Sequence, residues 1–276
     1  MLSDITLGQY FPGFSILHKL DPRTKIISSI IYIVAIFVIK NVIGYALLIL
    51  SALTLVFISK ISLKVIIKGI KPVIIVLIFT MILNLFWTVG EGEPLVQWWI
   101  IKIYIDGIYR AIFMSLRVLV LIVATSLFLT YTTSPRMLTD AIESLLSPLK
   151  KIHVPIHDFA MMMTIALRFI PTLIEETDKI MNAQKSRGAD FATGGLIKRA
   201  KALIPVLIPL LVSSFKRADE LAIAMECRCY RGGKGRTKFV KLTMKLSDYV
   251  FMTLIILFLA AVIAINYLPF GLRVGV

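Results

Sequence analysis

Two arginines occupy matching places in this chain, and their side chains are well suited to binding another molecule. They are Arg187 and Arg228, 41 positions apart, and each follows a long, partly apolar stretch in a strongly basic region. The runs around them are Gln184-Lys185-Ser186-Arg187-Gly188-Ala189 and Met225-Glu226-Cys227-Arg228-Cys229-Tyr230. A planar, permanently charged guanidinium suits docking into an acidic socket on another protein. The duplication therefore predicts a chain that holds a partner at two equivalent points.

The alternative interpretation of the arginines is that they only end helices. A cation complements the dipole at a helix C-terminus, and a following glycine can take the left-handed cap conformation. This explains Gly188 well and Arg187 in part. After Arg228 the next glycines are Gly232 and Gly233, so we do not expect the same cap there.

Composition indicates an integral membrane protein. The 276 residues are 58% hydrophobic and only 17% charged, and the mean hydropathy is +0.87. Soluble domains rarely carry so much apolar material. The net charge of +15 fits cytoplasmic loops rich in Lys and Arg. Nucleic-acid binding is disfavoured, because the chain lacks the polar surface that a basic groove needs. The first 22 residues do not have the pattern of a signal peptide.

The apolar segments predict five transmembrane helices in an all-α fold. They cover residues 26–39, 42–59, 72–89, 108–131 and 249–268. The first two are short, and we interpret them as spans joined by a tight turn at Lys40-Asn41, with a re-entrant pair as the alternative. Four lysines between residues 60 and 71 predict a cytoplasmic interfacial helix. Arg117 should face protein or reach a headgroup, with a substrate contact as the other possibility.

Residues 132–245 differ from the rest and predict a cytoplasmic domain. They hold 19 of the 31 Lys and Arg residues and 10 of the 16 acids, so this segment alone carries +9. Its apolar stretches, 159–174 and 202–215, are short and are interrupted by Arg168, Pro171, Pro205 and Pro209. If both crossed the membrane, the basic residues between them would lie outside. We expect three amphipathic helices instead, at about 135–150, 156–187 and 196–229, between membrane regions 1–131 and 246–276.

Several smaller patterns carry no chemistry of their own. Residues 231–237 are rich in glycine and basic residues but lack the phosphate-loop spacing. We therefore expect a flexible basic linker and no nucleotide site. Cys227 and Cys229 are expected to be reduced cytosolic thiols. Pro155 separates His153 from His157 and spoils a metal-binding helical face. No catalytic serine, metal or paired intramembrane carboxylate set is found.

The chain resembles the transmembrane T component of energy-coupling factor (ECF) transporters, the vitamin and metal importers of the ABC class. The resemblance rests on the run from Gly13 to Lys25, on Arg168 to Leu173 with Gln184 to Gly188, and on Ala224 to Arg231. It covers nearly the whole chain, and its parts come in the same order as in the family. The two family motifs depart here to Ser-Arg-Gly and Cys-Arg-Cys, which puts the cap role of the second glycine in doubt.

The resemblance implies a coupling component of the cell membrane with its middle domain in the cytoplasm. It implies two ABC ATPase subunits as partners, which would bind ATP and Mg²⁺ in place of this chain, together with small substrate-binding S components and the lipid bilayer. It implies ATPase docking by five residues around the arginines: Arg187, Gly188, Arg228, Ser186 and Glu226. The expected surface for the S component consists of Met161, Met162, Met163, Arg168 and Pro171. The methionines suit an adaptable apolar face, or ordinary packing.

Two questions stay open at this level. A coupler shared among several vitamin S components is favoured over a dedicated cobalt or nickel coupler. A membrane enzyme of lipid metabolism and a stand-alone secondary carrier are the functional alternatives. The enzyme would need a set of catalytic residues, and the carrier would need an ion-coupling residue within a span. The substrate itself would be set by another chain.

Overall fold

The computed structural model describes residues 10–88, 96–98, 101–152, 154–191, 195–232 and 242–267. The described residues form two compact units, each considered by itself. We call residues 10–138 with 242–267 the bundle unit, and residues 139–232 the helix-pair unit. Of the features discussed in the sequence analysis, His153 lies outside the described residues, and so does the linker at 231–237 from residue 233 on.

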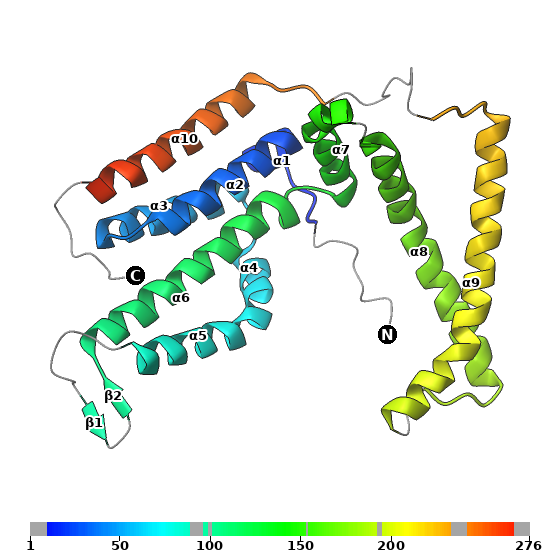
Figure 1. Cartoon of the computed structure of the whole chain (residues 1–276), viewed down its shortest axis with the longest axis horizontal. Helices are drawn as coiled ribbons and strands as arrows, with labels where there is room; N and C mark the ends of the chain where they lie inside the picture. The colour runs from blue at the N-terminus through cyan, green and yellow to red at the C-terminus, as the bar shows by residue number, and fades with distance from the viewer. Residues whose placement is uncertain are drawn as a thin grey trace. The chain divides into compact units, whose positions relative to one another are not determined.

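The architecture is helical, as predicted (Figure 1). The bundle unit contains α1 (Ile16–Lys19), α2 (Pro22–Val38), α3 (Val42–Ser59), α4 (Leu63–Ile70), the 3₁₀ turn η1 (Lys71–Val73), α5 (Ile74–Trp87), α6 (Ile105–Thr125), the π-helical turn η2 (Ser126–Tyr131) and α10 (Leu246–Tyr267). α7 (Pro135–Leu145) joins the units, and η3 (Ser147–Ile152), α8 (Ile156–Ser186) and α9 (Leu196–Cys227) follow. The only strands described, β1 (Val96–Trp98) and β2 (Ile101–Ile103), form an antiparallel hairpin that the sequence had not predicted.

The first two predicted spans are separate helices, and the predicted turn between them is confirmed. α2 starts at Pro22, which suits a first helical position, and Asp21 caps it by accepting a hydrogen bond from the Arg23 N–H. α10 is hydrogen-bonded to the short segment that connects α2 to α3. There the Asn266 side chain donates to the Val38 carbonyl over 2.6 Å, and the Asn41 side chain donates to the Ile265 carbonyl over 3.0 Å.

The core of the bundle unit gathers around Tyr32 on α2. Its ring is stacked on Phe258 of α10 at 5.3 Å and meets the edge of Phe128 in η2 at 5.9 Å. Phe128 lies in the π-helical turn at the end of α6 and is fully buried. The hydroxyl of Tyr32 shares a hydrogen bond with Ser51 of α3, which satisfies its polar atom in an apolar interior.

Arg117 on α6 is paired within the protein. It is only 6% exposed, and its guanidinium donates to the Ile39 carbonyl over 2.8 Å. The same group lies over the Tyr45 ring, 5.7 Å from its centre. These contacts give a mid-span arginine partners within the protein at the break between α2 and α3, although its buried Nε has no hydrogen-bond partner among the described residues.

Five helices among the described residues are long and apolar enough to cross a membrane by length and composition. They are α3, α4 with α5, α6 with η2, α8 and α10. The number is as predicted, but the set differs: α2, with 17 residues, is not among them, and α8 is. The other four long apolar segments coincide with predicted spans. The position of α8 relative to the membrane stays a prediction.

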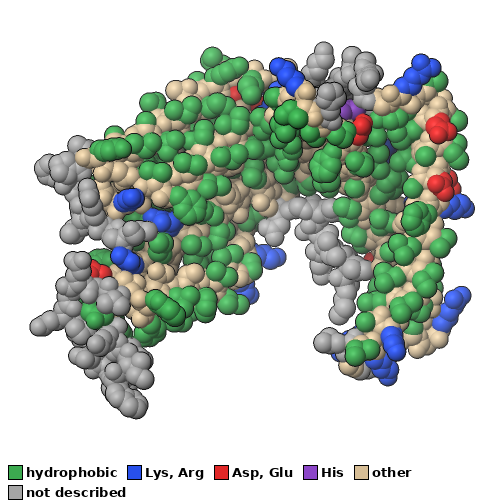
Figure 2. Space-filling model, in the orientation of Figure 1, with side chains coloured by type: hydrophobic (Ala, Val, Ile, Leu, Met, Phe, Trp, Pro, Cys, Tyr) green, Lys and Arg blue, Asp and Glu red, His purple; other side chains and the backbone are tan. Residues whose placement is uncertain are grey.

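The helix-pair unit contains the predicted helices, but its prolines do not interrupt them. Pro171 lies inside α8, and Pro205 and Pro209 lie inside α9. Each proline removes one backbone donor, and a helix of about 30 residues retains most of its hydrogen bonds. On the visible face of each unit, hydrophobic side chains cover much of the surface (Figure 2). One exposed stripe on α9 repeats every three or four residues: Ile204, Ile208, Leu211 and Phe215.

Candidate functional site

α8 and α9 pack against each other as an antiparallel pair within the helix-pair unit (Figure 1). Near one end of the pair, the Gln184 side chain donates to the Pro205 carbonyl over 3.5 Å. Further along, the Glu176 carboxylate accepts hydrogen bonds from Ser213 and, over 2.8 Å, from Arg217. Because the helices run in opposite directions, their C-terminal ends lie at opposite ends of the pair.

α8 ends in a regular left-handed cap at the first arginine. Arg187 is the C-cap residue of α8, with φ −89°, and the next residue, Gly188, takes φ +87°. The Gly188 N–H donates to the Lys185 carbonyl over 2.9 Å, and the Ala189 N–H donates to the Gln184 carbonyl over 3.0 Å. These two bonds are those of a Schellman motif, so Gly188 has the cap role predicted for it.

α9 ends in the same motif, and the expectation that no such cap would form there is wrong. Arg228 has φ −92°, and Cys229 takes the left-handed conformation with φ +55°. The Cys229 N–H donates to Glu226 over 2.8 Å, and the Tyr230 N–H donates to Met225 over 3.1 Å. A cysteine thus occupies the place that Gly188 occupies after α8. The sequence argument failed because it looked for a glycine, whereas the backbone accepts a small side chain at some cost.

Both arginines present their side chains to the outside. Arg187 and Arg228 are exposed, as are Ser186 and Glu226 beside them. Within the described part of the chain, no hydrogen bond or ion pair engages either guanidinium. Each arginine follows the Glu176–Arg217 contact by 11 residues along its own helix (187 − 176 and 228 − 217). At 1.5 Å per residue in opposite directions, the two guanidinium-bearing ends are roughly 30 Å apart. They can therefore fill two separate sockets but not one.

The Glu176 contact is a feature that the sequence analysis missed. Glu176, Ser213 and Arg217 form a polar cluster at the packing face of α8 and α9, and the Glu176 side chain is only 20% exposed. Residues 176 and 217 are separated by the same 41 positions as the two arginines, but contacts across an antiparallel pair follow no constant separation, so this spacing did not signal the contact. The cluster fixes the register of the two helices, because a slip by one turn would leave the carboxylate without its partners.

A hollow of about 650 Å³ lies beside the second arginine. Its wall includes Arg228, Tyr230 and Met225 of the α9 end together with Met161 and Ile165 of α8. The structure thus brings together Met161, predicted for the S-component surface, and Arg228, predicted for ATPase docking. A smaller groove of about 270 Å³ continues along the pair and is mainly apolar; Phe169, Leu173, Leu221 and Ala222 are among its lining residues.

The other residues predicted for the S-component surface lie along α8. Met162 and Met163 are 58% and 40% exposed, and Arg168 and Pro171 are exposed as well. Met161 is half-buried and faces the hollow beside Arg228. The methionines therefore do not share a single environment, although an apolar surface is available on this helix.

No group of three metal-binding side chains is found where the structure describes the chain. His157 instead bonds to Glu143 of α7 over 3.0 Å, and Glu143 is buried. Cys227 and Cys229 are free thiols and both are exposed, on either side of Arg228. His157 thus has a partner within the helix-pair unit, and the two thiols lie at its surface.

Comparison with known proteins places the chain among membrane transport components. Residues 13–239 match the family described as cobalt transport protein (CbiQ). The chain is similar to the energy-coupling factor transporter transmembrane protein EcfT of Clostridium kluyveri, with 54% identity over 250 residues, 91% of this chain and 92% of the relative. The EcfT of Ruminiclostridium cellulolyticum is 52% identical over 98% of this chain and 100% of the relative. For the EcfT of Bacillus subtilis the identity is 47%, over 93% and 97%.

Proposed function

Because the chain belongs to the family of energy-coupling factor transporter transmembrane proteins, we propose that it couples ATP hydrolysis by two ABC ATPases to uptake by an S component. The match to this family covers most of the chain. In this proposal the chain is the non-catalytic membrane subunit: the ATPases bind ATP and Mg²⁺, and a small membrane S component binds the substrate. The cargo is a vitamin or another micronutrient.

The observation that carries the proposal is the pair of identical caps at opposite ends of the helix pair. Each cap holds an exposed arginine in the same backbone conformation, with φ −89° and φ −92°. A helix C-terminus fixes the Cα position of the arginine, so little backbone entropy is lost when the guanidinium enters a socket. Two ATPase subunits, each with one acidic groove, would match this arrangement.

The S component is proposed to meet the apolar surfaces of α8 and α9. The exposed methionines Met162 and Met163 and the stripe that contains Phe215 supply flexible and bulky contact groups. Such surfaces repack around different partners, which favours a coupler shared by several S components. The family description as cobalt transport favours the other candidate, a coupler dedicated to one metal.

The docking claim is tested by reversing the two charges together. The double variant Arg187→Glu with Arg228→Glu should lose its ATPases during affinity purification in mild detergent, with at least about a tenfold drop in recovered ATPase, because each desolvated arginine pair contributes several kcal/mol. The matched control is Lys198→Glu with Arg199→Glu. It makes the same change in net charge at the exposed start of α9, where acids suit the helix dipole.

Mass spectrometry of the wild-type preparation also decides between the candidates. Several small hydrophobic proteins co-purifying with two ATPases support the shared coupler, and a single one supports the dedicated coupler. Retention of ATPases by the charge-reversed double variant at the level of the control would refute arginine docking. Recovery of the wild-type chain alone would refute the coupling role as a whole.

A further inference from the structure

The start of α2 contacts the segments that precede α7 and α10, the two helices next to which the chain leaves and rejoins the bundle unit. The chain leaves the bundle unit after Leu138, within α7, and rejoins it at Leu242, just before α10. Asp21, Arg23 and Lys25 lie within about one turn of each other at the N-terminus of α2. All the contacts described below lie within the bundle unit.

The exit of the chain is bound by Lys25. Its ammonium group donates to the Thr132 carbonyl over 2.8 Å and to the Thr133 hydroxyl over 3.3 Å. Lys25 is 1% exposed, and both threonines are buried. Thr132 follows the π-helical end of α6, where backbone carbonyls have no partner in the next turn. The lysine therefore closes the end of α6 at the point from which α7 departs.

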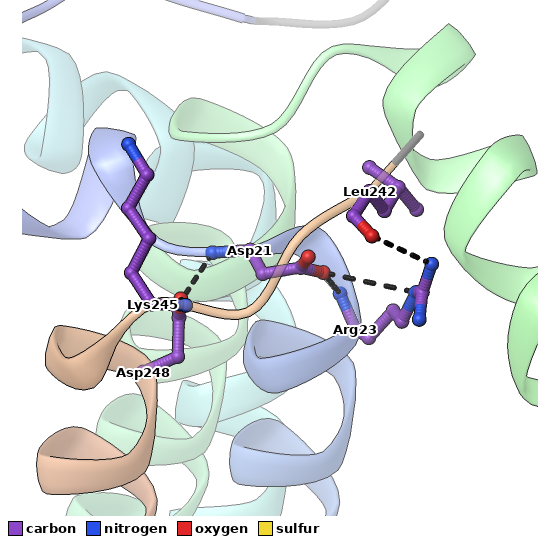
Figure 3. Close-up of polar contacts among 5 residues, drawn as sticks. All are labelled: Asp21, Arg23, Leu242, Lys245 and Asp248. Atoms are coloured by element: carbon purple, nitrogen blue, oxygen red, sulfur yellow. Dashed lines mark hydrogen bonds and ion pairs between the residues drawn. The ribbon is translucent and has the colours of Figure 1, made fainter. Parts of the chain in front are cut away.

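The return of the chain is bound by Arg23 and Asp21 (Figure 3). The Arg23 guanidinium donates to the Leu242 carbonyl over 3.4 Å. The Asp248 carboxylate accepts one hydrogen bond from the Asp21 N–H and another from the Lys245 N–H, each over 2.7 Å. The second of these bonds is half of a capping box, so Asp248 starts α10 and joins it to α2 at once.

The charges of this cluster oppose the local preference of α2. Cations in the first turn of a helix are unfavourable next to its dipole, yet Arg23 and Lys25 are both there. Asp21 and Asp248 offset them, and these acids are 6% and 2% exposed. Burying the three ionic groups of Asp21, Lys25 and Asp248 is costly unless each is paired. The position of the two cations is explained by the backbone carbonyls to which they donate. These carbonyls, of Leu242 and Thr132, lie on the two connections.

We propose that Asp21, Arg23, Lys25 and Asp248 form a clamp that transmits movement of the helix-pair unit to the membrane helices. This inference rests on the proposed coupling function. With both connections fixed to α2, a displacement of the helix-pair unit is passed on to α2, α6 and α10. Loose connections would absorb it. The four residues are positioning residues: they touch no substrate, and they set how rigidly α7 and the segment before α10 are held.

The first test measures amide hydrogen exchange in the purified full chain. Lys25→Gln should speed exchange in peptides from 128–138, and Asp248→Asn should do so in peptides from 20–23 and 242–250, each by about tenfold. The matched controls are Lys40→Gln and Asp106→Asn, which alter exposed side chains of the same kinds. Unchanged exchange at both connections would overturn the clamp. Arg23→Gln, at the 25% exposed edge of the cluster, is the milder variant if either of the others fails to fold.

The second test measures coupling in vesicles that contain the chain, its ATPases and its S component. The probe is whichever of riboflavin, folate, thiamine and Co²⁺ the wild-type vesicles take up. For Lys25→Gln and Asp248→Asn, the amount of probe taken up per ATP hydrolysed should fall about tenfold while ATPase recovery stays at the level of the controls. An unchanged ratio would overturn the proposal, even if yield, hydrolysis and uptake all fell together.

The two tests separate the clamp from the function on which it rests. If the wild-type chain recovers no ATPase, the coupling function fails, and hydrogen exchange still reports whether the connections are held. If the wild-type complex transports and the variants transport with the same efficiency per ATP, the clamp fails and the coupling function stands.

Discussion

At the end of α9, Cys229 takes a backbone conformation that residues with a side chain rarely adopt. Its φ of +55° is the left-handed value that glycine adopts at no steric cost. Cys229→Gly should therefore stabilise the helix-pair unit by about 0.5–1 kcal/mol, because the removed strain exceeds the entropy that glycine loses on folding. Thermal unfolding of the purified chain in detergent measures the change.

The two caps provide controls for this prediction. Gly188→Ala should destabilise by about 1 kcal/mol, because alanine meets the same left-handed strain at φ +87°. Nothing lies within 4 Å of the added Cβ, so no clash contributes. Cys227→Gly, inside α9, should also destabilise the helix, by roughly 0.5–1 kcal/mol. A loss of stability with Cys229→Gly would show that the thiol has a contact which outweighs the strain.

Among the helices, the contact of Glu176 with Arg217 links α8 to α9. A double-mutant cycle with Glu176→Gln and Arg217→Gln should give a coupling energy of about 1 kcal/mol. The value is modest because the Arg217 side chain is 37% exposed, so solvent screens the pair. Ser213→Ala should separately weaken the structure, because the hydroxyl also donates to Glu176.

Thermal unfolding of the four members of the cycle measures this energy. Lys179→Gln is the matched control, since Lys179 is exposed on α8 near the contact. It should change stability by less than about 0.5 kcal/mol. A coupling energy near zero would mean that apolar packing alone sets the register of the pair.

For the whole molecule, the prediction concerns which helices cross the bilayer. In a chain with Cys227 and Cys229 replaced by serine, a cysteine at Lys185 should react with a membrane-impermeant maleimide only after the cells are opened. A cysteine at Asp106, by contrast, should react in intact cells. The physical reason is the basic charge around residue 185, which favours the cytoplasmic side. The labelled fractions should differ by about tenfold or more between intact and opened cells.

The outcome for Lys185 decides the role of α8. Although α8 is long and apolar enough to cross a membrane, it also carries Arg168 and a cluster of acids from 175 to 178. Labelling of the Lys185 position in intact cells would mean that α8 spans the bilayer and that the predicted cytoplasmic domain is wrong. Labelling at Asp106 serves as the control that the reagent reaches outer positions.

The sequence predicted elements better than the contacts between them. Apolar runs and turn residues located the break between α2 and α3, because such signals act over a few neighbouring residues. The cost of a charge in lipid indicated that the Arg117 side chain would face protein. The sequence did not indicate that its partners are Ile39 and Tyr45. The same holds for Lys25 and Thr132, which are bonded across 107 positions. The left-handed cap at Cys229 was missed because the argument looked for a glycine, whereas local hydrogen bonds hold a cysteine in that conformation.

The contact of Glu176 with Arg217 has a consequence for symmetry. These residues stand at equivalent places, each 11 positions before its own terminal arginine. A contact between equivalent places of two antiparallel helices lies on a local dyad, which exchanges α8 with α9 and Arg187 with Arg228. One asymmetric polypeptide thus presents a pseudo-symmetric face. A partner built from two like subunits around its own two-fold axis can meet both halves of that face with the same surface.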